Sequence, residues 1–314
     1  MDTSVMITLG FLVFAIVMFA WEKIPLSITA MVVAVGLHLS GVLSAKEAFA
    51  GFVDPNVLLF MGMFVIGEAF FATGVAVGVG NVVHKFAKTE TSLLVAVMMI
   101  TGILSGFLSN TGTAAVLIPV IIGICKKSGF KQTKLLMPLV FAAAMGGNIS
   151  LIGAPGNMIA QAGLQQAGLG SFGFFDYGLV GLPILIVGTI FYATIGKRFL
   201  PDTPSHQPDG AFEGNDDYSH VPSWKKWTSA LVLILTVGAM IFEKQLGVKL
   251  YVSAWVGALV LVATNVISES AAVRSIDMKT IMLFAGSMAL GDAMVKTGTG
   301  SVIADIIVNS LGAS

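Results

Sequence analysis

A polar pentapeptide, Ser109-Asn110-Thr111-Gly112-Thr113, interrupts an apolar stretch that runs from Ser92 to Cys125. Inside a bilayer such a break persists only where it is buried in protein or lines a water-filled cavity. The carbonyl oxygens of an unwound chain, together with serine and asparagine oxygens, suit Na⁺ without a buried carboxylate. A half-helix beginning at Ala114 would present free N–H groups and a positive dipole end, which suit a carboxylate. The pattern predicts a site for a cation and an anion; the alternative is a turn between two short helices.

A second apolar stretch, Leu135–Ala162, carries the same polar theme. It is interrupted at Gly146-Gly147-Asn148-Ile149-Ser150 and again at Gly153-Ala154-Pro155-Gly156-Asn157. We expect the two breaks to lie near the middle of the membrane, where they can face each other. This recurrence favours a binding site over a simple turn.

The composition agrees with a membrane setting for these breaks. Of 314 residues, 56% are hydrophobic and 11% are charged, with a mean hydropathy of +0.91. Soluble domains carry about 25% charged residues. Seventeen basic residues balance seventeen acidic ones, so no global field attracts nucleic acid. The single cysteine, Cys125, excludes a disulfide within the chain. We predict an all-α polytopic membrane protein.

Seven further apolar runs are candidate spans, because about 20 apolar residues cross a bilayer. The third run is interrupted at Thr73-Gly74, and its tail, Val75–Lys88, is an alternative interfacial helix. The segment Pro201–Trp227 is polar and rich in proline, which predicts a solvated linker. The runs are Val5–Ala20, Ile24–Leu43, Val57–Val79, Tyr177–Phe199, Thr228–Phe242, Val252–Ile267 and Thr280–Met294.

Lysine and arginine positions predict the topology. The loops on both sides of Ser92–Cys125 are basic, with Lys85 and Lys88 before it and four lysines after it. A re-entrant hairpin that enters and leaves on the cytoplasmic side places both loops inside. This choice puts thirteen basic residues inside and four outside. The N-terminus is then outside, and the linker is cytoplasmic.

Three clusters recur at one spacing. Gly67-Glu68-Ala69 matches Gly291-Asp292-Ala293, and the matches of Leu59-Phe60-Met61-Gly62 and of Thr73-Gly74 also lie 224 residues later. The predicted topology runs the two copies in opposite directions across the membrane. Inverted-topology repeats are typical of secondary transporters. A second Ser-Asn-Thr motif is then expected near residue ~333 and a complete second copy would end near ~423. We therefore expect the chain to be truncated at its C-terminus and inactive by itself.

The two polar motifs carry a family resemblance. The segment Ser109–Ala115 resembles the hairpin-tip SNTAT motif of the divalent anion/sodium symporter family, part of the ion transporter superfamily. The segment Gly146–Asn157 resembles that family's GGTxTLIGTPPN motif. The resemblance extends over the segment order of the whole chain and implies an elevator mechanism and a homodimer. We predict a location in the cell membrane. Asn148 and Gly156 depart from the family pattern and leave the choice among C4-dicarboxylates, citrate and sulfate open.

The resemblance also implies site residues and an organisation. The implied substrate-binding residues are Ser109, Asn110, Thr111 and Pro155. The implied sodium-binding residues are Ser105, Ser109, Asn110, Asn148 and Gly153. Na⁺ is the coupling ion, and no other metal, cofactor or catalytic residue is expected. The implied parts are scaffold helices of repeat 1 (1–88), a transport part (89–199), a cytoplasmic linker (200–227) and scaffold helices of an incomplete repeat 2 (228–314). The transport part holds the hairpin 92–125, the broken helix 135–162 and the helix 177–199.

Two other functions stay open. A cation/proton antiporter or an arsenite-type permease has the same superfamily fold, although few carboxylates lie in the predicted spans. An intramembrane enzyme is disfavoured because the sequence has no HExxH, GxSxG or CxxC motif.

A few remaining residues have structural interpretations. Glu68 and Asp292 are acids inside apolar runs, and we expect structural or interfacial roles, with Asp292 able to pair with Lys296 one turn later. Gly102 and Gly106 predict close helix packing within the hairpin.

Overall fold

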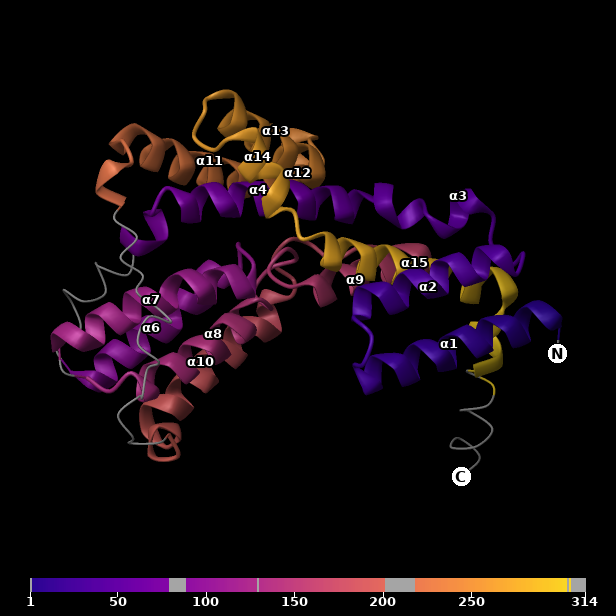
Figure 1. The fold of residues 1–314 in the computed structure, drawn as a ribbon, viewed down its shortest axis with the longest axis horizontal. Helices are drawn as coiled ribbons and strands as arrows, with labels where there is room; N and C mark the ends of the chain where they lie inside the picture. The colour runs from indigo at the N-terminus through magenta and orange to yellow at the C-terminus, as the bar shows by residue number, and fades with distance from the viewer. Residues whose placement is uncertain (1, 79–88, 129, 201–217, 304, 306–314) are drawn as a thin grey trace. The chain divides into compact units, whose positions relative to one another are not determined.

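The computed structural model describes residues 2–78, 89–128, 130–200, 218–303 and 305 (Figure 1). Every regular element in these ranges is a helix, which confirms the all-α prediction. The chain forms two compact units. Unit 1 comprises 1–58, 159–171 and 277–314, and unit 2 comprises 59–158 and 172–276.

Four of the described helices are long and apolar enough to cross a membrane, which confirms an integral membrane protein. They are α1 (Thr3–Trp21), α4 (Pro55–Ala72), α11 (Ser223–Ile241) and α15 (Met278–Thr297). Six shorter helices are also apolar. They are α2 (Leu26–Leu39), α6 (Glu90–Ser105), α7 (Asn110–Ser128, apolar to Cys125), α8 (Thr133–Gly146), α10 (Gly178–Thr194) and α13 (Leu250–Ala263).

Unit 1 is built around α2 and α15, which pack against each other beside α1. Gly286 of α15 lies so close to Ala30 of α2 that a Cβ there would collide with the Ala30 backbone. The buried core between these helices contains Val33, Leu37 and Ala289. The unit also contains the short helices α3 (Ala45–Ala48) and η1 (Ala50–Val53) and most of α9 (Pro155–Gln166).

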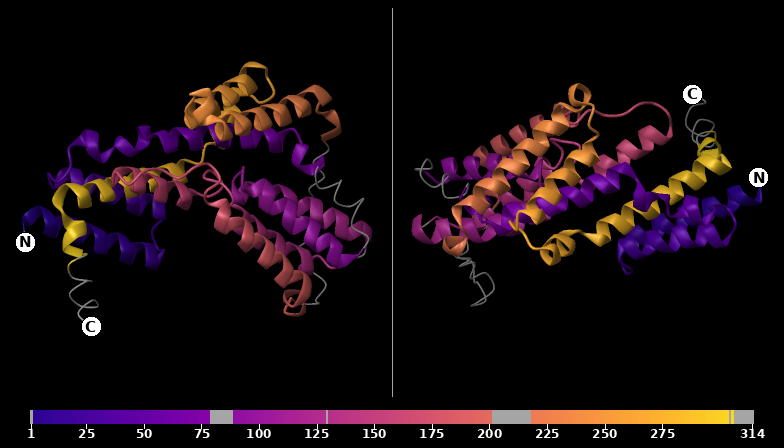
Figure 2. Two further views of the ribbon diagram at one scale, coloured as in Figure 1. Left: turned by 180° about the vertical axis from the view of Figure 1, so that it is seen from behind. Right: turned by 90° about the horizontal axis from the view of Figure 1, so that it is seen from above.

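Unit 2 contains the two interrupted segments. Helices α6, α7, α8 and α10 form a bundle whose core includes Met98, Leu117, Leu139 and Leu185. In the same unit α11 and α13 lie side by side (Figure 2). Gly62 of α4 lies against Ala254 of α13. The unit also holds η2 (Gly196–Arg198), η3 (Tyr218–His220), α12 (Glu243–Leu246) and α14 (Glu269–Ser275).

Both predicted interruptions are present, with one change of position. The hairpin segment consists of α6 and α7 separated by residues 106–109, and the second segment consists of α8 and α9 separated by 147–154. The expectation that the second limb of the hairpin begins at Ala114 is wrong, because α7 begins at Asn110. The Ser109 hydroxyl accepts the Gly112 N–H at 3.1 Å, so the polar motif caps the helix and forms its first turn.

Local structure repeats at the spacing found in the sequence. Helices α2 and α13 have 14 residues each and begin 224 residues apart, at Leu26 and Leu250. Gly41 follows α2 with φ 77°, and Asn265 follows α13 with φ 55° at the same spacing. Left-handed backbone is uncommon outside glycine, so Asn265 is the unusual member of this pair.

The interruption expected at Thr73-Gly74 is confirmed, since α4 ends at Ala72 and Gly74 has φ 75°. Its counterpart Gly298 ends α15 with φ 73°. The opposite membrane orientation of the two copies stays a prediction. So does the division into scaffold and transport parts. The tail 79–88, linker residues 201–217 and the end of the chain from 306 lie outside the described residues.

Two expected packing contacts differ from the structure. Gly102 and Gly106 do not pack the limbs of the hairpin together: their backbone lies against Gly146 of α8. Lys296 does not pair with Asp292, because its ammonium group lies 2.8 and 2.9 Å from the carboxylate oxygens of Glu47. The carboxylate of Glu47 comes from α3, so this pair joins two elements of unit 1. Glu68 and Asp292 are each half-buried.

Candidate functional site

Three oxygens in unit 2 surround the side-chain amide of Asn110. Ser105 Oγ lies 2.6 Å from the amide, and the carbonyl oxygens of Gly153 and Ala143 lie 3.0 and 3.2 Å away. Because these atoms are acceptors, the amide is oriented with its nitrogen toward them. Ser105 is fully buried and its hydroxyl also donates to Ala143 O at 2.7 Å. We call the Ser105, Ala143 and Gly153 oxygens the oxygen cradle.

The N-terminus of α7 lies directly beside the oxygen cradle, because Asn110 is its first residue. The N–H groups of a first helical turn lack partners within the helix and attract anions. The first turn of α7 contains no acidic side chain, and Thr111 is exposed there. Thr113 is fully buried in this turn, and its hydroxyl has no hydrogen-bond partner among the described residues.

The second break is held by its own polar side chains. Asn157 is buried, and its amide donates to the carbonyl oxygens of Gly147 and Ser150, each at 2.9 Å. The hydroxyl of Ser150 donates to Gly106 O in the hairpin break. Tyr177 at the start of α10 donates to Asn157 O at 2.7 Å. The bonds to Gly106, Gly147 and Ser150 satisfy carbonyl groups that the interrupted helices leave open, as a low-dielectric environment requires.

Glycines bring the helices close enough for these bonds to form. A Cβ on Gly146 would collide with the carbonyl oxygen and Cα of Gly102. A Cβ on Gly181 of α10 would collide with the carbonyl group of Asn148. Small residues at such contacts are typical of helices packed in membranes.

The predicted site residues fall into two groups. Ser105, Asn110 and Gly153 meet at the oxygen cradle, with Ser109 next to Asn110 as the cap of α7. Asn148 lies outside the cradle, and its amide donates at 3.3 Å to Ala144 O of its own segment. Pro155 is exposed at the first position of α9, which suits proline because no N–H is needed there.

Sequence reasoning missed the roles of Ser150, Asn157 and Tyr177. Ser150 and Asn157 belong to the quoted second motif, and an amide within an apolar run is a signal for a buried polar contact. Their partners are backbone carbonyls, which carry no sequence signature. Tyr177 offers no signal beyond its place at the start of a span.

Comparison with known proteins supplies a family. The family model described as citrate transporter (CitMHS) matches residues 16–314. An uncharacterized transporter of Escherichia coli K12, YfbS, is 33% identical over 211 residues, which are 67% of this chain and 35% of that protein. An uncharacterized transporter of Synechocystis is 31% identical over 201 residues, 64% of this chain and 33% of that protein. One from Haemophilus influenzae is 25% identical over 319 residues, 96% of this chain and 67% of that protein.

The chain thus spans about a third of the length of the first two relatives. The family match agrees with the resemblance to ion transporters seen in the two motifs. The matched family and these relatives are transporters, not enzymes.

Proposed function

The chain belongs to the citrate transporter family, and from this premise we propose that the protein is a Na⁺-coupled importer of small divalent anions, with citrate as the first candidate. Dicarboxylates and sulfate are the other candidates that the motif resemblance gives. The observation that carries the proposal is the oxygen cradle around Asn110, beside the N-terminus of α7.

The oxygen cradle fits a monovalent cation. The atoms that would coordinate the cation are one hydroxyl oxygen and two backbone carbonyl oxygens, all neutral. They lie within 3.2 Å of one amide nitrogen. The Gly153 carbonyl lies in the break between α8 and α9, and unwound carbonyls of this kind hold Na⁺ in secondary transporters. The Ala143 carbonyl belongs to the last turn of α8. Rotation of the Asn110 amide by half a turn would present its own oxygen to the same point. We therefore assign Ser105, Asn110 and Gly153 to the cation, with Ser109 and Asn148 as further ligands implied by the resemblance.

The helix N-termini at the two breaks fit the anion. Neither α7 nor α9 has an acidic side chain in its first turn, so the first turn itself does not oppose the positive end of the helix dipole. We assign Ser109, Asn110 and Thr111 at α7 and Pro155 at α9 to the substrate. The buried Thr113 hydroxyl supports the assignment, because an unpartnered polar atom in this turn gains from a bound group or water.

The cation and anion parts of the proposed site share one residue, and this couples the binding of the two ligands. Asn110 takes part in both, so a bound cation fixes the first residue of the anion-binding turn of α7. Each ligand then strengthens the binding of the other by the same factor. An elevator movement, a homodimer, a cell-membrane location and an external N-terminus complete the proposal and rest on the resemblance and the positive-inside pattern.

A matched pair of serine variants tests the proposal. Ser105 and Ser229 are both fully buried serines in apolar helices of unit 2, but Ser229 Oγ has no hydrogen-bond partner among the described residues. Radiolabelled citrate uptake is measured in proteoliposomes containing the full-length protein, with an inward Na⁺ gradient. Ser105→Ala is expected to raise the Na⁺ concentration for half-maximal uptake about 10- to 100-fold, as expected for loss of a contact to a charged group. Ser229→Ala is expected to leave it unchanged.

Two results would contradict the proposal. One is equal Na⁺ dependence in both serine variants. The other is a Na⁺-driven pH change in the absence of any citrate, dicarboxylate or sulfate uptake, which would identify an antiporter instead.

A further inference from the structure

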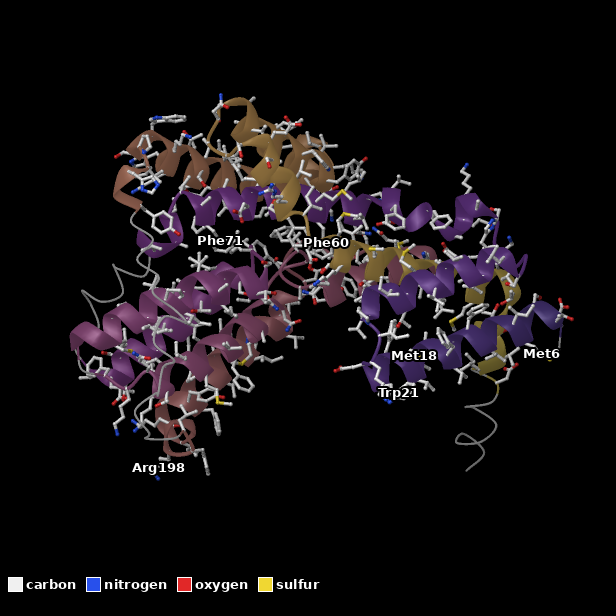
Figure 3. All side chains as sticks on the ribbon, in the orientation of Figure 1. Met6, Met18, Trp21, Phe60, Phe71 and Arg198 are labelled. Atoms are coloured by element: carbon white, nitrogen blue, oxygen red, sulfur yellow. The ribbon has the colours of Figure 1, made fainter. Side chains whose placement is uncertain are left out.

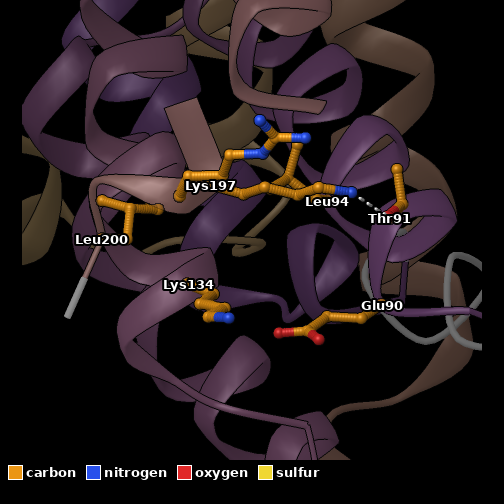
Figure 4. A pocket seen from close by; sticks show the side chains of 7 residues that line it. Glu90, Thr91, Leu94, Lys134, Lys197 and Leu200 are labelled. Carbon is orange, nitrogen blue, oxygen red and sulfur yellow. Dashed lines mark hydrogen bonds between the residues drawn. The ribbon is translucent and has the colours of Figure 1, made fainter. Parts of the chain in front are cut away.

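A polar cavity of about 400 Å³ lies at one end of the bundle in unit 2 (Figure 4). It is formed where α6 and α8 begin and where the chain leaves α10. Ends of apolar helices lie at the water-facing side of the hydrocarbon layer. None of its lining residues belongs to the oxygen cradle. They are Glu90, Thr91, Leu94, Lys134, Lys197, Arg198 and Leu200.

The charge in this cavity is mainly positive. Of the lining residues that the structure describes, Lys134, Lys197 and Arg198 are cationic and Glu90 is a carboxylate. The Lys197 ammonium group donates to the Thr91 hydroxyl at 3.1 Å, which holds it at the cavity (Figure 4). Arg198 lies at the end of the bundle (Figure 3) and has no ion pair with another described residue. Among the described lining residues, three cations from two separate helix ends therefore converge beside one carboxylate.

The walls also have an apolar part. Leu94 of α6 is buried beside the charged groups, and Leu200 is buried at the opposite edge of the cavity. A ligand that fits this cavity must carry concentrated negative charge and must also be able to lie against apolar side chains. Phosphate fits the charge, because an arginine guanidinium binds its oxygens in pairs and lysine adds a point charge.

We propose that this pocket binds a phosphate-bearing anion, with an anionic phospholipid headgroup and free phosphate as its two sources. Basic pockets between helices at the membrane surface bind such headgroups. A bound group would draw together the starts of α6 and α8 and the end of α10, and so stabilise the bundle that carries the oxygen cradle. This inference is independent of the anion that the protein transports.

The test uses the purified full-length protein in phosphatidylcholine nanodiscs containing phosphatidylglycerol. Retained lipid is counted by native mass spectrometry. The protein is expected to retain phosphatidylglycerol in preference to phosphatidylcholine. The double variant Lys197→Gln/Arg198→Gln is expected to bind it about 30-fold more weakly, from two surface charges.

Two control variants accompany this measurement. Lys244→Gln/Arg274→Gln removes the same two residue types from exposed positions of unit 2 outside the pocket, and retention should be unchanged. Lys197→Arg/Arg198→Lys keeps both charges, and it should retain the lipid if the charge of the pocket is responsible.

A second arm identifies the source of the phosphate. Inorganic phosphate is titrated into the protein in pure phosphatidylcholine nanodiscs, and the melting temperature is recorded. A saturable increase that is lost in Lys197→Gln/Arg198→Gln supports free phosphate, while selective phosphatidylglycerol retention without such an increase supports the headgroup. If neither ligand binds, or if Lys244→Gln/Arg274→Gln reduces binding as much as the pocket variant does, the inference is overturned.

Discussion

Asn110 at the start of α7 donates its side-chain amide to the carbonyl oxygen of Gly153, 3.0 Å away in the break between α8 and α9. This contact joins the two interruptions of unit 2 through one polar side chain. The Ser150 hydroxyl forms a second link, to Gly106 O. Two reciprocal side-chain-to-backbone bonds thus hold the breaks against each other.

Gly146→Ala is expected to destabilise the protein by about 1–3 kcal/mol, because the added methyl group overlaps the backbone of Gly102. The free energy of unfolding in detergent, measured by denaturant titration, checks this. Gly123→Ala on α7 is the matched control, since nothing lies within 4 Å of a Cβ there. It should be neutral or stabilising by up to about 1 kcal/mol. Equal effects of the two variants would show that the contact between α6 and α8 is looser than the structure shows.

Asn157→Ala is expected to cost about 1–2 kcal/mol, because two buried carbonyl groups lose their donor. The same unfolding titration measures it. Asn148→Ala removes an amide with one longer contact, at 3.3 Å, and should change stability by less than about 0.5 kcal/mol. A larger decrease in the free energy of unfolding for Asn148→Ala than for Asn157→Ala would contradict the proposed role of Asn157 in holding the second break.

The Glu47–Lys296 pair predicts a pH dependence in unit 1. The hydrogen bonds from the Lys296 ammonium group, with those from Ser44, lower the pKa of Glu47 from 4.5 to about 2. A lowered carboxyl pKa stabilises the folded state above the ordinary pKa, and that contribution is lost as the pH falls from 4.5 toward 2. The pair is exposed, so the effect is small.

Melting curves of the protein and of Glu47→Gln measure this dependence. The two melting temperatures should differ most near neutral pH and converge as the pH falls below 4.5. Glu243→Gln is the control, because its carboxylate lies 3.7 Å from Lys249 and forms a looser pair. If the difference in melting temperature between the protein and Glu47→Gln instead grows as the pH falls, the prediction is contradicted.

The helical class and the two interruptions were predictable from the sequence because each depends on local composition. Runs of apolar residues mark the spans, and Ser109-Asn110 or Gly146-Gly147 mark the breaks. The predicted start of α7 lies four residues late because a Ser-Asn-Thr segment is typical of a loop, whereas Ser109 caps the helix that follows. The partner of Lys296 was not predictable, because Glu47 is 249 residues away whereas Asp292 is four residues away.

The sequence pointed to several residues of the candidate site, but it did not indicate most of the contacts that those residues make. Ser105, Asn110 and Gly153 were identified through the family resemblance, and they meet in the structure. The Ala143 carbonyl and the bonds of Asn157 were not predictable, because backbone acceptors have no residue identity. The contact predicted for Gly102 is wrong, since a GxxxG pattern indicates close packing but does not name the neighbouring helix.

The most direct test of Na⁺-coupled anion import is the initial rate of radiolabelled citrate uptake into proteoliposomes carrying the full-length protein, with and without an inward Na⁺ gradient. The proposed site predicts uptake that requires Na⁺ and that Asn110→Ala abolishes, because Asn110 is shared by the cation and anion halves of the site. Dicarboxylate and sulfate are measured in parallel as the alternative substrates. Full uptake of any of these anions in the absence of Na⁺, unchanged by Asn110→Ala, would contradict Na⁺-coupled import through this site.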